Sequence, residues 1–212
     1  MKEVESHRNI AGYDTFSQAH QDLFVLAVTD FMRNGSYLEV GASEPKQSNN
    51  TYLLESRYGW KGASIEIDPQ LCEEFNKTRT NKCILADATN FDFSAHLSAN
   101  APNDRINYLS LDIDPSRVTL TALKRIPLDR FRFDVITFEH DLYASGPEVM
   151  TESRDIFEFH GYQRVVSNVM CCGRDFEDWY VDPTVVSESV WAPFFATRVE
   201  CAQIFSCLGP RI

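Results

Sequence analysis

Two short apolar stretches, each ending in a turn that carries carboxylates, limit what this chain can fold into. Residues 37–40 lead into a turn over 41–45, and residues 63–67 lead into the pair Asp68 and Pro69. In an open α/β sheet, a ligand binds outside the carboxyl ends of the strands. A carboxylate that closes the second strand, here Glu66, can accept hydrogen bonds from both ribose hydroxyls. The pattern therefore predicts an α/β protein with a nucleoside site.

The turn after the first stretch is unsuited to a pyrophosphate. A dinucleotide site uses G-x-G-x-x-G, so that bare backbone and a helix N-terminus surround the phosphates. Here only Gly41 is present, and Glu44 and Pro45 follow it. Glu39 and Glu44 would repel a pyrophosphate, whereas S-adenosylmethionine carries a cationic sulfonium and ammonium and no phosphate. We expect S-adenosylmethionine to be the cofactor.

Length and charge limit the organisation and the partners. The 212 residues, 43% of them hydrophobic, suit one domain over 1–212, with a polar N-terminal segment over 1–15 and a C-terminal extension over 184–212. The net charge of -11 argues against a nucleic-acid partner. The N-terminus has no apolar signal region, and no run is long enough to span a membrane. We expect a soluble, cytoplasmic protein without a membrane partner.

The six cysteines do not form a recognisable framework. Without a secretory context reduced thiols are the default. Cys171 and Cys172 are adjacent, and no C-x-x-C pairs with a second one or with suitably spaced histidines. We therefore expect small buried hydrophobes rather than a zinc site.

Alternating segments predict a mostly parallel sheet with helices on both faces. Leu23, Leu26, Ala27 and Phe31 recur at helical spacing, which predicts a helix over 18–31 with Ser17 as its cap. Further helices are expected over 50–58, 69–76, 117–125 and 147–159, and strands over 37–40, 63–67, 83–86, 106–112, 133–139 and 163–168. The aromatic tail over 179–212 is expected to pack on the domain, cap the site or make a contact in a homo-oligomer, and the sequence does not choose.

Acidic residues collect where the expected strands end. They are Glu39, Glu66, Asp87, Asp112, Asp114, Glu139 and Asp141, with His140 between the last two. Aspartates are common caps and turn formers, which alone could explain Asp68, Asp87 and Asp114. Glu39 and Glu66 are harder to explain in this way, because glutamate is a poor turn residue and both interrupt apolar strands.

The ordered motifs of this chain resemble the FkbM family of S-adenosylmethionine-dependent methyltransferases. The similarity rests on Ser17-Gln18, Gln21-Asp22, residues 37–42 (YLEVGA), 48–55 (SNNTYLLE), 59–62 (GWKG), 65–69 (IEIDP), 108–114 (YLSLDID), 136–141 (ITFEHD) and 176–183 (FEDWYVDP). It implies the class I methyltransferase fold, a Rossmann-like, seven-stranded, mostly parallel sheet whose last strand is antiparallel. It also implies O-methylation of a small molecule or a sugar.

The resemblance also implies a set of cofactor contacts. Glu39, Gly41, Ala42 and Ser43 would meet the methionine moiety, Glu66 the ribose, Ile67 the adenine face, and Asp87 with Ala88 the adenine edge, while Gln18, Gln21, Asn50 and Asp112 would help to hold the cofactor. The chain departs from the family in having Ser-Glu-Pro where Asn or Asp followed by Gly is commoner. The turn must therefore reach its helix differently.

Methyl transfer to a hydroxyl needs alignment and a base. The sulfonium's charge disperses during an in-line displacement, and a nearby base takes the hydroxyl proton. His140 is the first candidate for this base because of its intrinsic pKa, and Asp112 is the second. A histidine that only caps or pairs beside the pocket is the alternative role for His140. A metal held by Asp112, Asp114, His140 and Asp141 is the rival device, although the spacing is not a metal signature and we expect none.

Two alternative functions stay open: a cofactor-binding protein and an oxidoreductase. A binding protein could keep the cofactor pocket without catalysis. A short oxidoreductase would need a Gly-rich first turn and a Tyr-x-x-x-Lys pair, both of which this chain lacks.

Overall fold

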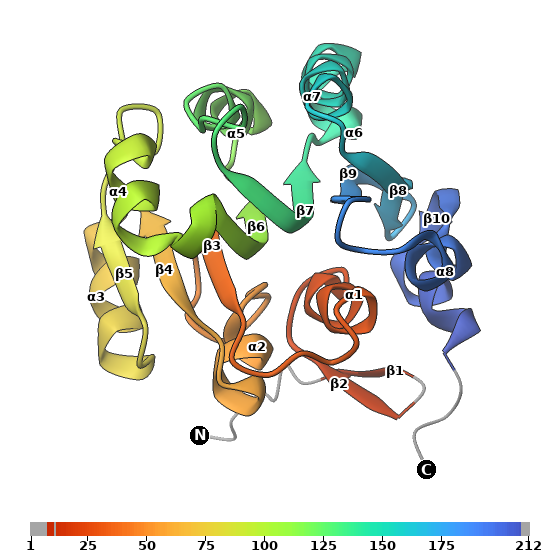
Figure 1. Cartoon of the computed structure of the whole chain (residues 1–212), viewed down its shortest axis with the longest axis horizontal. Helices are drawn as coiled ribbons and strands as arrows, with labels where there is room; N and C mark the ends of the chain where they lie inside the picture. Colours follow the sequence, from red (N-terminus) through yellow and green to blue (C-terminus); the bar gives the residue numbers. More distant parts are fainter. Residues whose placement is uncertain (1–7, 11, 209–212) are drawn as a thin grey trace.

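An eight-stranded sheet forms the centre of the computed structural model, which describes residues 8–10 and 12–208. The strand order is β10-β8-β9-β7-β6-β3-β4-β5, and β9 runs antiparallel to both of its neighbours while the other seven strands share one direction. The sheet crosses the middle of the view in Figure 1. Its strands are β3 (Ser36–Val40), β4 (Lys61–Glu66), β5 (Lys82–Leu85), β6 (Arg105–Leu111), β7 (Arg132–Glu139), β8 (Gln163–Cys171), β9 (Arg174–Val181) and β10 (Ala196–Glu200).

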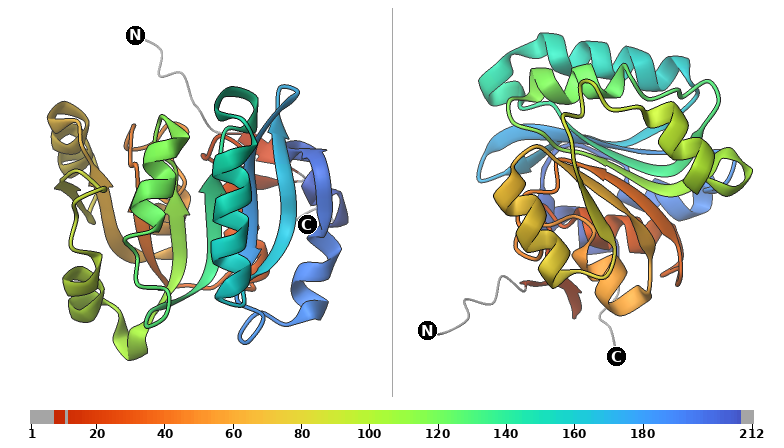
Figure 2. Two further views of the ribbon diagram at one scale, coloured as in Figure 1. Left: turned by 90° about the horizontal axis from the view of Figure 1, so that it is seen from above. Right: turned by 90° about the vertical axis from the view of Figure 1, so that its left-hand side faces the viewer.

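Helices cover both faces of this sheet, as Figures 1 and 2 show. The α-helices are α1 (Gln21–Val28), α2 (Tyr52–Tyr58), α3 (Pro69–Thr78), α4 (Phe93–Asn100), α5 (Ser116–Leu123), α6 (Leu142–Ser145), α7 (Pro147–Phe159) and α8 (Glu188–Trp191). Short 3₁₀ turns are η1 (Pro102–Asp104), η2 (Ala192–Phe194) and η3 (Cys201–Cys207). One buried cluster lies between the sheet and α1 with α2, and a second lies between the sheet and α4, α5 and α7. The two faces are therefore apolar, as a parallel sheet requires.

The expected strands and helices all form, most with ends shifted by a few residues. α7 has the predicted bounds, whereas α1 begins at Gln21 because His20 takes a left-handed φ of 68°. Ser17 still satisfies the first turn of α1, since its hydroxyl accepts a hydrogen bond from the Asp22 amide at 3.0 Å. Asp68 caps α3 by accepting from the amides of Gln70 and Leu71. The cap explanation therefore holds for Asp68.

The two ends of the chain add elements that the periodicity did not predict. β1 (Arg8–Ile10) and β2 (Tyr13–Thr15) form a hairpin within the expected polar segment, of which residues 1–7 and 11 lie outside the described part. At the other end, β10 extends the expected seven strands to eight by pairing in parallel with β8. Phe194, Ile204 and Phe205 are buried in the cluster that contains α1. Of the three expectations for the tail, packing on the domain is confirmed.

Within the described ranges, no helix combines the length and the hydropathy that crossing a membrane requires.

Candidate functional site

A cavity of about 440 Å³ opens at the carboxyl ends of β3, β4, β6 and β7, and we call it the strand-end cavity. This is where an open α/β sheet binds its ligands. Its lining consists of Gln18, Glu39, Gly41, Ala42, Ser43, Ser48, Asn49, Asn50, Ile65, Glu66, Ile67, Leu71, Ala86, Asp87, Ala88, Asp112, Ile113, Asp114, Val118 and Glu139. Every cofactor residue named from the sequence except Gln21 is in this set. Gln21 is buried instead, and its Nε2 donates to Glu177 Oε2 at 2.7 Å.

The turn after β3 depends on glycine at position 41. Gly41 has a φ of +90°, and a Cβ built on it would lie 1.8 Å from the Asp112 carbonyl oxygen. The backbones of the β3 and β6 ends thus touch where the cavity begins. The unusual Ser-Glu-Pro turn forms without a second glycine, because Ser43 itself takes a left-handed φ of 47°. Its amide then points at Glu66 and donates to Oε2 at 2.8 Å.

Glu66 closes β4 with its carboxylate held in place by the backbone. Oε1 accepts from the amides of Ile67 at 2.8 Å and Asp68 at 2.9 Å, and Oε2 accepts from Ser43. A carboxylate has about four acceptor positions, so one oxygen can still take a ribose hydroxyl. The side chain is fixed at the cavity wall before any ligand arrives.

Glu39 lies deeper, in β3, and is 1% exposed. Its Oε2 accepts from Ser64 Oγ at 2.6 Å and Thr51 Oγ1 at 3.0 Å. Burial raises the pKa of Glu39 to about 7, even though Arg79 and these hydroxyls act in the opposite direction. This carboxyl therefore gains or loses its proton near neutral pH.

Asn50 has an unused acceptor beside the cavity. Its Nδ2 donates to Ser110 Oγ at 3.0 Å and lies 3.4 Å from Asp112 Oδ2, and the residue is 4% exposed. Among the described residues, no group donates to its buried Oδ1. Since buried polar atoms are normally satisfied, this oxygen indicates a missing donor.

The far end of the cavity combines an apolar surface with a turn. Ile67 is 65% exposed although it is a large aliphatic residue, and Ala88, which also lines the cavity, is buried. Asp87 accepts from the Thr89 amide at 2.8 Å and from Thr89 Oγ1 at 2.7 Å, and these bonds lower its pKa. Asp87 thus forms the turn that the sequence allowed, and it lines the cavity as well.

Asp112 and Glu139 share a hydrogen bond across the ends of β6 and β7. Burial is the largest cause that raises the pKa of Glu139, and the neighbouring Asp112 charge raises it further. Two carboxyls that share a hydrogen bond cannot easily both ionise. The pair therefore favours holding one proton between its two carboxyls.

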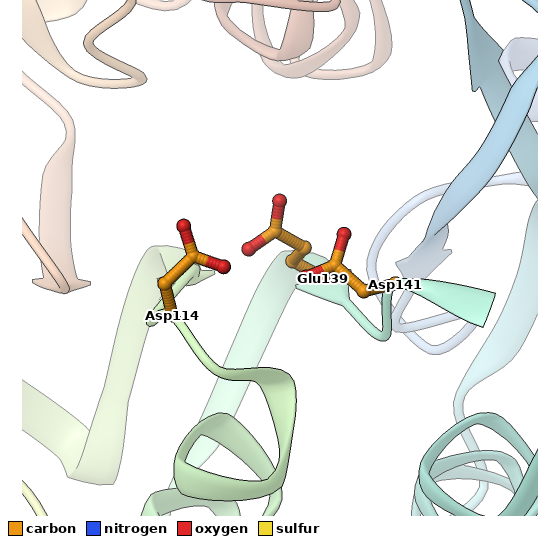
Figure 3. Close-up of side chains that lie close together, drawn as sticks. All are labelled: Asp114, Glu139 and Asp141. Atoms are coloured by element: carbon orange, nitrogen blue, oxygen red, sulfur yellow. The ribbon is translucent and has the colours of Figure 1, made fainter. Parts of the chain in front are cut away.

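Glu139 also converges with Asp114 and Asp141, and we call these three residues the carboxylate trio. Each can place one oxygen within 4.8 Å of the others, and Figure 3 shows the three side chains turned toward a common space. Burial, followed by the charges of Asp114 and Asp112, raises the pKa of Asp141 to about 6. Asp114 does not cap α5, whose first turn has no side-chain cap. The capping explanation for Asp114 was wrong.

His140 does not reach the cavity lining and is completely buried. Its Nδ1 accepts from the Leu142 amide at 3.2 Å, which places the ring proton on Nε2, 3.4 Å from Asp178 Oδ1. Although burial opposes it, His140 and Arg154 together hold the pKa of Asp178 well below its usual range. The structure therefore buries this histidine beside Asp178 and away from the cavity lining, and the described residues do not bring together the metal set that included it.

The sequence analysis did not select several lining residues. Asn49 is one, and its Oδ1 accepts from the amides of Thr51 and Tyr52 at the start of α2. It lies in the 48–55 motif, which offered a signal. Leu71 and Val118 carry no chemical signal in the sequence, because apolar lining residues look like core residues.

Comparisons with known proteins give the fold a name. No family model and no curated protein matches the sequence. Fibrillarin of Aeropyrum pernix, solved with natively bound S-adenosyl-L-methionine, aligns with a TM-score of 0.51 at 15% identity, over 85% of this chain and 84% of that one. A candidate rRNA methylase from Clostridium thermocellum aligns with a TM-score of 0.50 at 14% identity, over 76% and 92%. The mostly parallel sheet with its antiparallel β8–β9 hairpin has the class I S-adenosylmethionine-dependent methyltransferase fold.

Proposed function

We propose that the protein is an S-adenosylmethionine-dependent methyltransferase that acts on a hydroxyl of a small molecule or a sugar. The observation that carries the proposal is the charge of the strand-end cavity. Six of its lining residues are carboxylic acids, and none of the lining residues within the described chain is Lys, Arg or His. Such a cavity favours a cationic nucleoside over a phosphorylated one. The fibrillarin structure, which holds this cofactor, supports the choice.

The cofactor's parts match the chemistry along the cavity. Glu66 accepts from the ribose hydroxyls, and Ile67 offers its exposed side chain to the adenine. The methionine end lies by the Gly41 turn, where Asn50 Oδ1 accepts from the ammonium and Asp112 carries the opposite charge. This arrangement supplies a donor to Asn50 Oδ1, which has none among the described residues.

A carboxylate, rather than His140, takes the acceptor's proton in this proposal. Asp141 is the first candidate: it does not line the strand-end cavity itself, but it belongs to the carboxylate trio with the lining residues Asp114 and Glu139, and its pKa of about 6 keeps it ionised at neutral pH. A base with a pKa near the working pH combines the correct protonation state with driving force. Asp112 remains the second candidate.

Membership of the FkbM family is part of the proposal, supported by the order of the motifs over residues 17–183. RNA, the acceptor that the name of the Clostridium thermocellum protein suggests for that protein, fits poorly here. The net charge of -11 and the acidic rim would repel a phosphate backbone. We therefore propose neither a nucleic-acid nor a membrane partner.

Calorimetry tests the cofactor. Titration with S-adenosylmethionine should show one site, and titration with NADH should show none. Asn50→Ala should lower the affinity for the cofactor by roughly tenfold or more, because a hydrogen bond to an ammonium is worth about 1.5–3 kcal/mol. The exposed Asn100, at the end of α4, gives the matched control Asn100→Ala. Binding of NADH, or equal affinities in both variants, would contradict the proposed site.

Formation of S-adenosylhomocysteine with a panel of hydroxyl acceptors tests catalysis. The rate should rise with pH through about 6, where Asp141 loses its proton, and Asp141→Asn should flatten that profile. Cofactor binding without product for any acceptor would favour the alternative, a binding protein that lacks catalysis.

A further inference from the structure

The tip of the β8–β9 hairpin carries two adjacent cysteines, neither of which is in a disulfide. Cys171 is the last residue of β8 and pairs with Arg174, so Cys172 and Gly173 form a two-residue turn. Both turn residues have positive φ, 56° and 77°, as a type I′ turn requires. Cys171 is half-buried, Cys172 is exposed, and their Sγ atoms lie 3.9 Å apart.

We propose that Cys171 and Cys172 form a redox-modification site that a peroxide oxidises to a vicinal disulfide. The exposed Cys172 thiol attacks the peroxide, the O–O bond breaks, and a sulfenic acid and one water form when hydrogen peroxide is the oxidant. The Cys171 thiol then attacks the sulfenic sulfur, the S–S bond forms, and the hydroxyl leaves with a proton as a second water. Two electrons pass from the two thiols to one peroxide.

The modification should be reversible because the product is strained. Neighbouring Cα atoms are about 3.8 Å apart across a trans peptide. Ordinary disulfides span about 4.4–6.8 Å between Cα atoms, and departures from that geometry make the bond easier to reduce. Strained and exposed disulfides are the ones that serve regulation. The other cysteines are less open to a peroxide: Cys72 and Cys83 lie against each other but are buried, Cys201 is buried, and the exposed Cys207 directs its Sγ at the Ile204 carbonyl.

The hairpin is coupled to the loop that carries Asp141. The Phe176 carbonyl oxygen accepts from the His140 amide at 2.7 Å and from the Asp141 amide at 2.9 Å. On the same strand, the Arg174 guanidinium lies 5.2 Å from the centre of the Tyr143 ring, and Tyr143 hydrogen-bonds Asp141. Closing an eight-membered ring at Cys171 and Cys172 must change the turn that leads directly into Arg174. Oxidation should therefore loosen the loop over 140–143.

Mass spectrometry of the full chain tests the site. In a Cys207→Ser background, equimolar hydrogen peroxide followed by N-ethylmaleimide should leave both Cys171 and Cys172 unalkylated and the protein lighter by two hydrogens. Dithiothreitol should restore both thiols, and Cys172→Ser should abolish the mass loss. Alkylation of both thiols after peroxide, or a disulfide to another cysteine, would overturn the assignment.

Hydrogen exchange tests the coupling without relying on the proposed enzymatic activity. The amides of His140 and Asp141 should exchange faster after oxidation and return to their original rates after reduction. As an internal reference, the Gly41 amide, which donates to the Ile65 carbonyl at 3.0 Å, should keep its rate. Unchanged exchange over residues 140–141 in a fully oxidised sample would refute the link to the loop.

Discussion

Substituting Gly41 by alanine should show how closely the cavity is built on two touching backbones. The new Cβ would lie 1.8 Å from the Asp112 carbonyl oxygen, far inside van der Waals contact, and its neighbour is backbone rather than a flexible side chain. The left-handed φ alone costs an L-residue about 1–2 kcal/mol. Overpacking adds typically about 1–3 kcal/mol. We therefore expect Gly41→Ala to lose about 2–5 kcal/mol of unfolding free energy.

Gly161, which follows α7, supplies the matched control. It has a φ of +78°, but a Cβ there would meet nothing within 4 Å. Gly161→Ala should therefore lose only the conformational part, about 1–2 kcal/mol. The difference between the two variants measures the clash alone.

Thermal and urea unfolding, followed by circular dichroism, measure both variants. For a chain of this size, about 1 kcal/mol shifts the midpoint by roughly 2–4 °C. Gly41→Ala should also weaken the binding of S-adenosylmethionine, because β3 and β6 must separate to make room for the alanine side chain. Gly161→Ala should bind the cofactor with normal affinity. Equal losses of stability in the two variants would refute the argument from close approach.

Three further substitutions probe single side chains. Glu66→Gln should lower the affinity for S-adenosylmethionine roughly tenfold to hundredfold in calorimetry, since a charged acceptor for the ribose hydroxyls is lost. Glu44→Gln, on the exposed part of the turn, is its control and should change nothing. In the wild type, the folded-state pKa of Glu39, about 7, exceeds the ordinary value of 4.5, so the free energy of unfolding falls by about 3 kcal/mol as pH rises between these values. Glu39→Gln removes this titration and should therefore flatten the pH dependence of unfolding. His140→Ala should lower the unfolding free energy by about 1–3 kcal/mol, because the buried Asp178 loses the imidazole 3.4 Å away and the Leu142 amide loses its acceptor. Cofactor affinity should stay unchanged, and weaker binding would instead return His140 to the site.

The sequence predicted the wall of the cavity because strand ends have a fixed geometry. Residues that close parallel strands must meet at one edge of the sheet, so the sequence alone places Glu66, Asp112 and Glu139 close together. Their roles as ligands stay predictions. The neighbouring His140 shows the limit of the same reasoning, because one further residue along the chain turns the side chain away from the cavity and toward Asp178.

Strands whose apolar pattern is interrupted were harder to predict. β9 contains Asp175, Glu177 and Asp178, so its sequence does not alternate like a strand. These acids are accommodated by partners far away in the sequence, such as Gln21 for Glu177 and Arg154 for Asp178. A local pattern cannot reveal such partners, because they exist only once the sheet has formed.

The buried acids explain why the cavity and the stability of the fold oppose each other. Burial raises the pKa of Asp112, Glu139 and Glu177. The Asp114 charge raises the pKa of Asp112 further, and the Asp112 charge does the same for Glu139 and Glu177. Without a ligand, the protein would be more stable with neutral side chains at these three positions. A ligand that brings positive charge to the cavity relieves this repulsion, whereas a neutral or anionic ligand does not. The same crowding that costs the empty protein stability therefore becomes the selectivity of the site for a sulfonium.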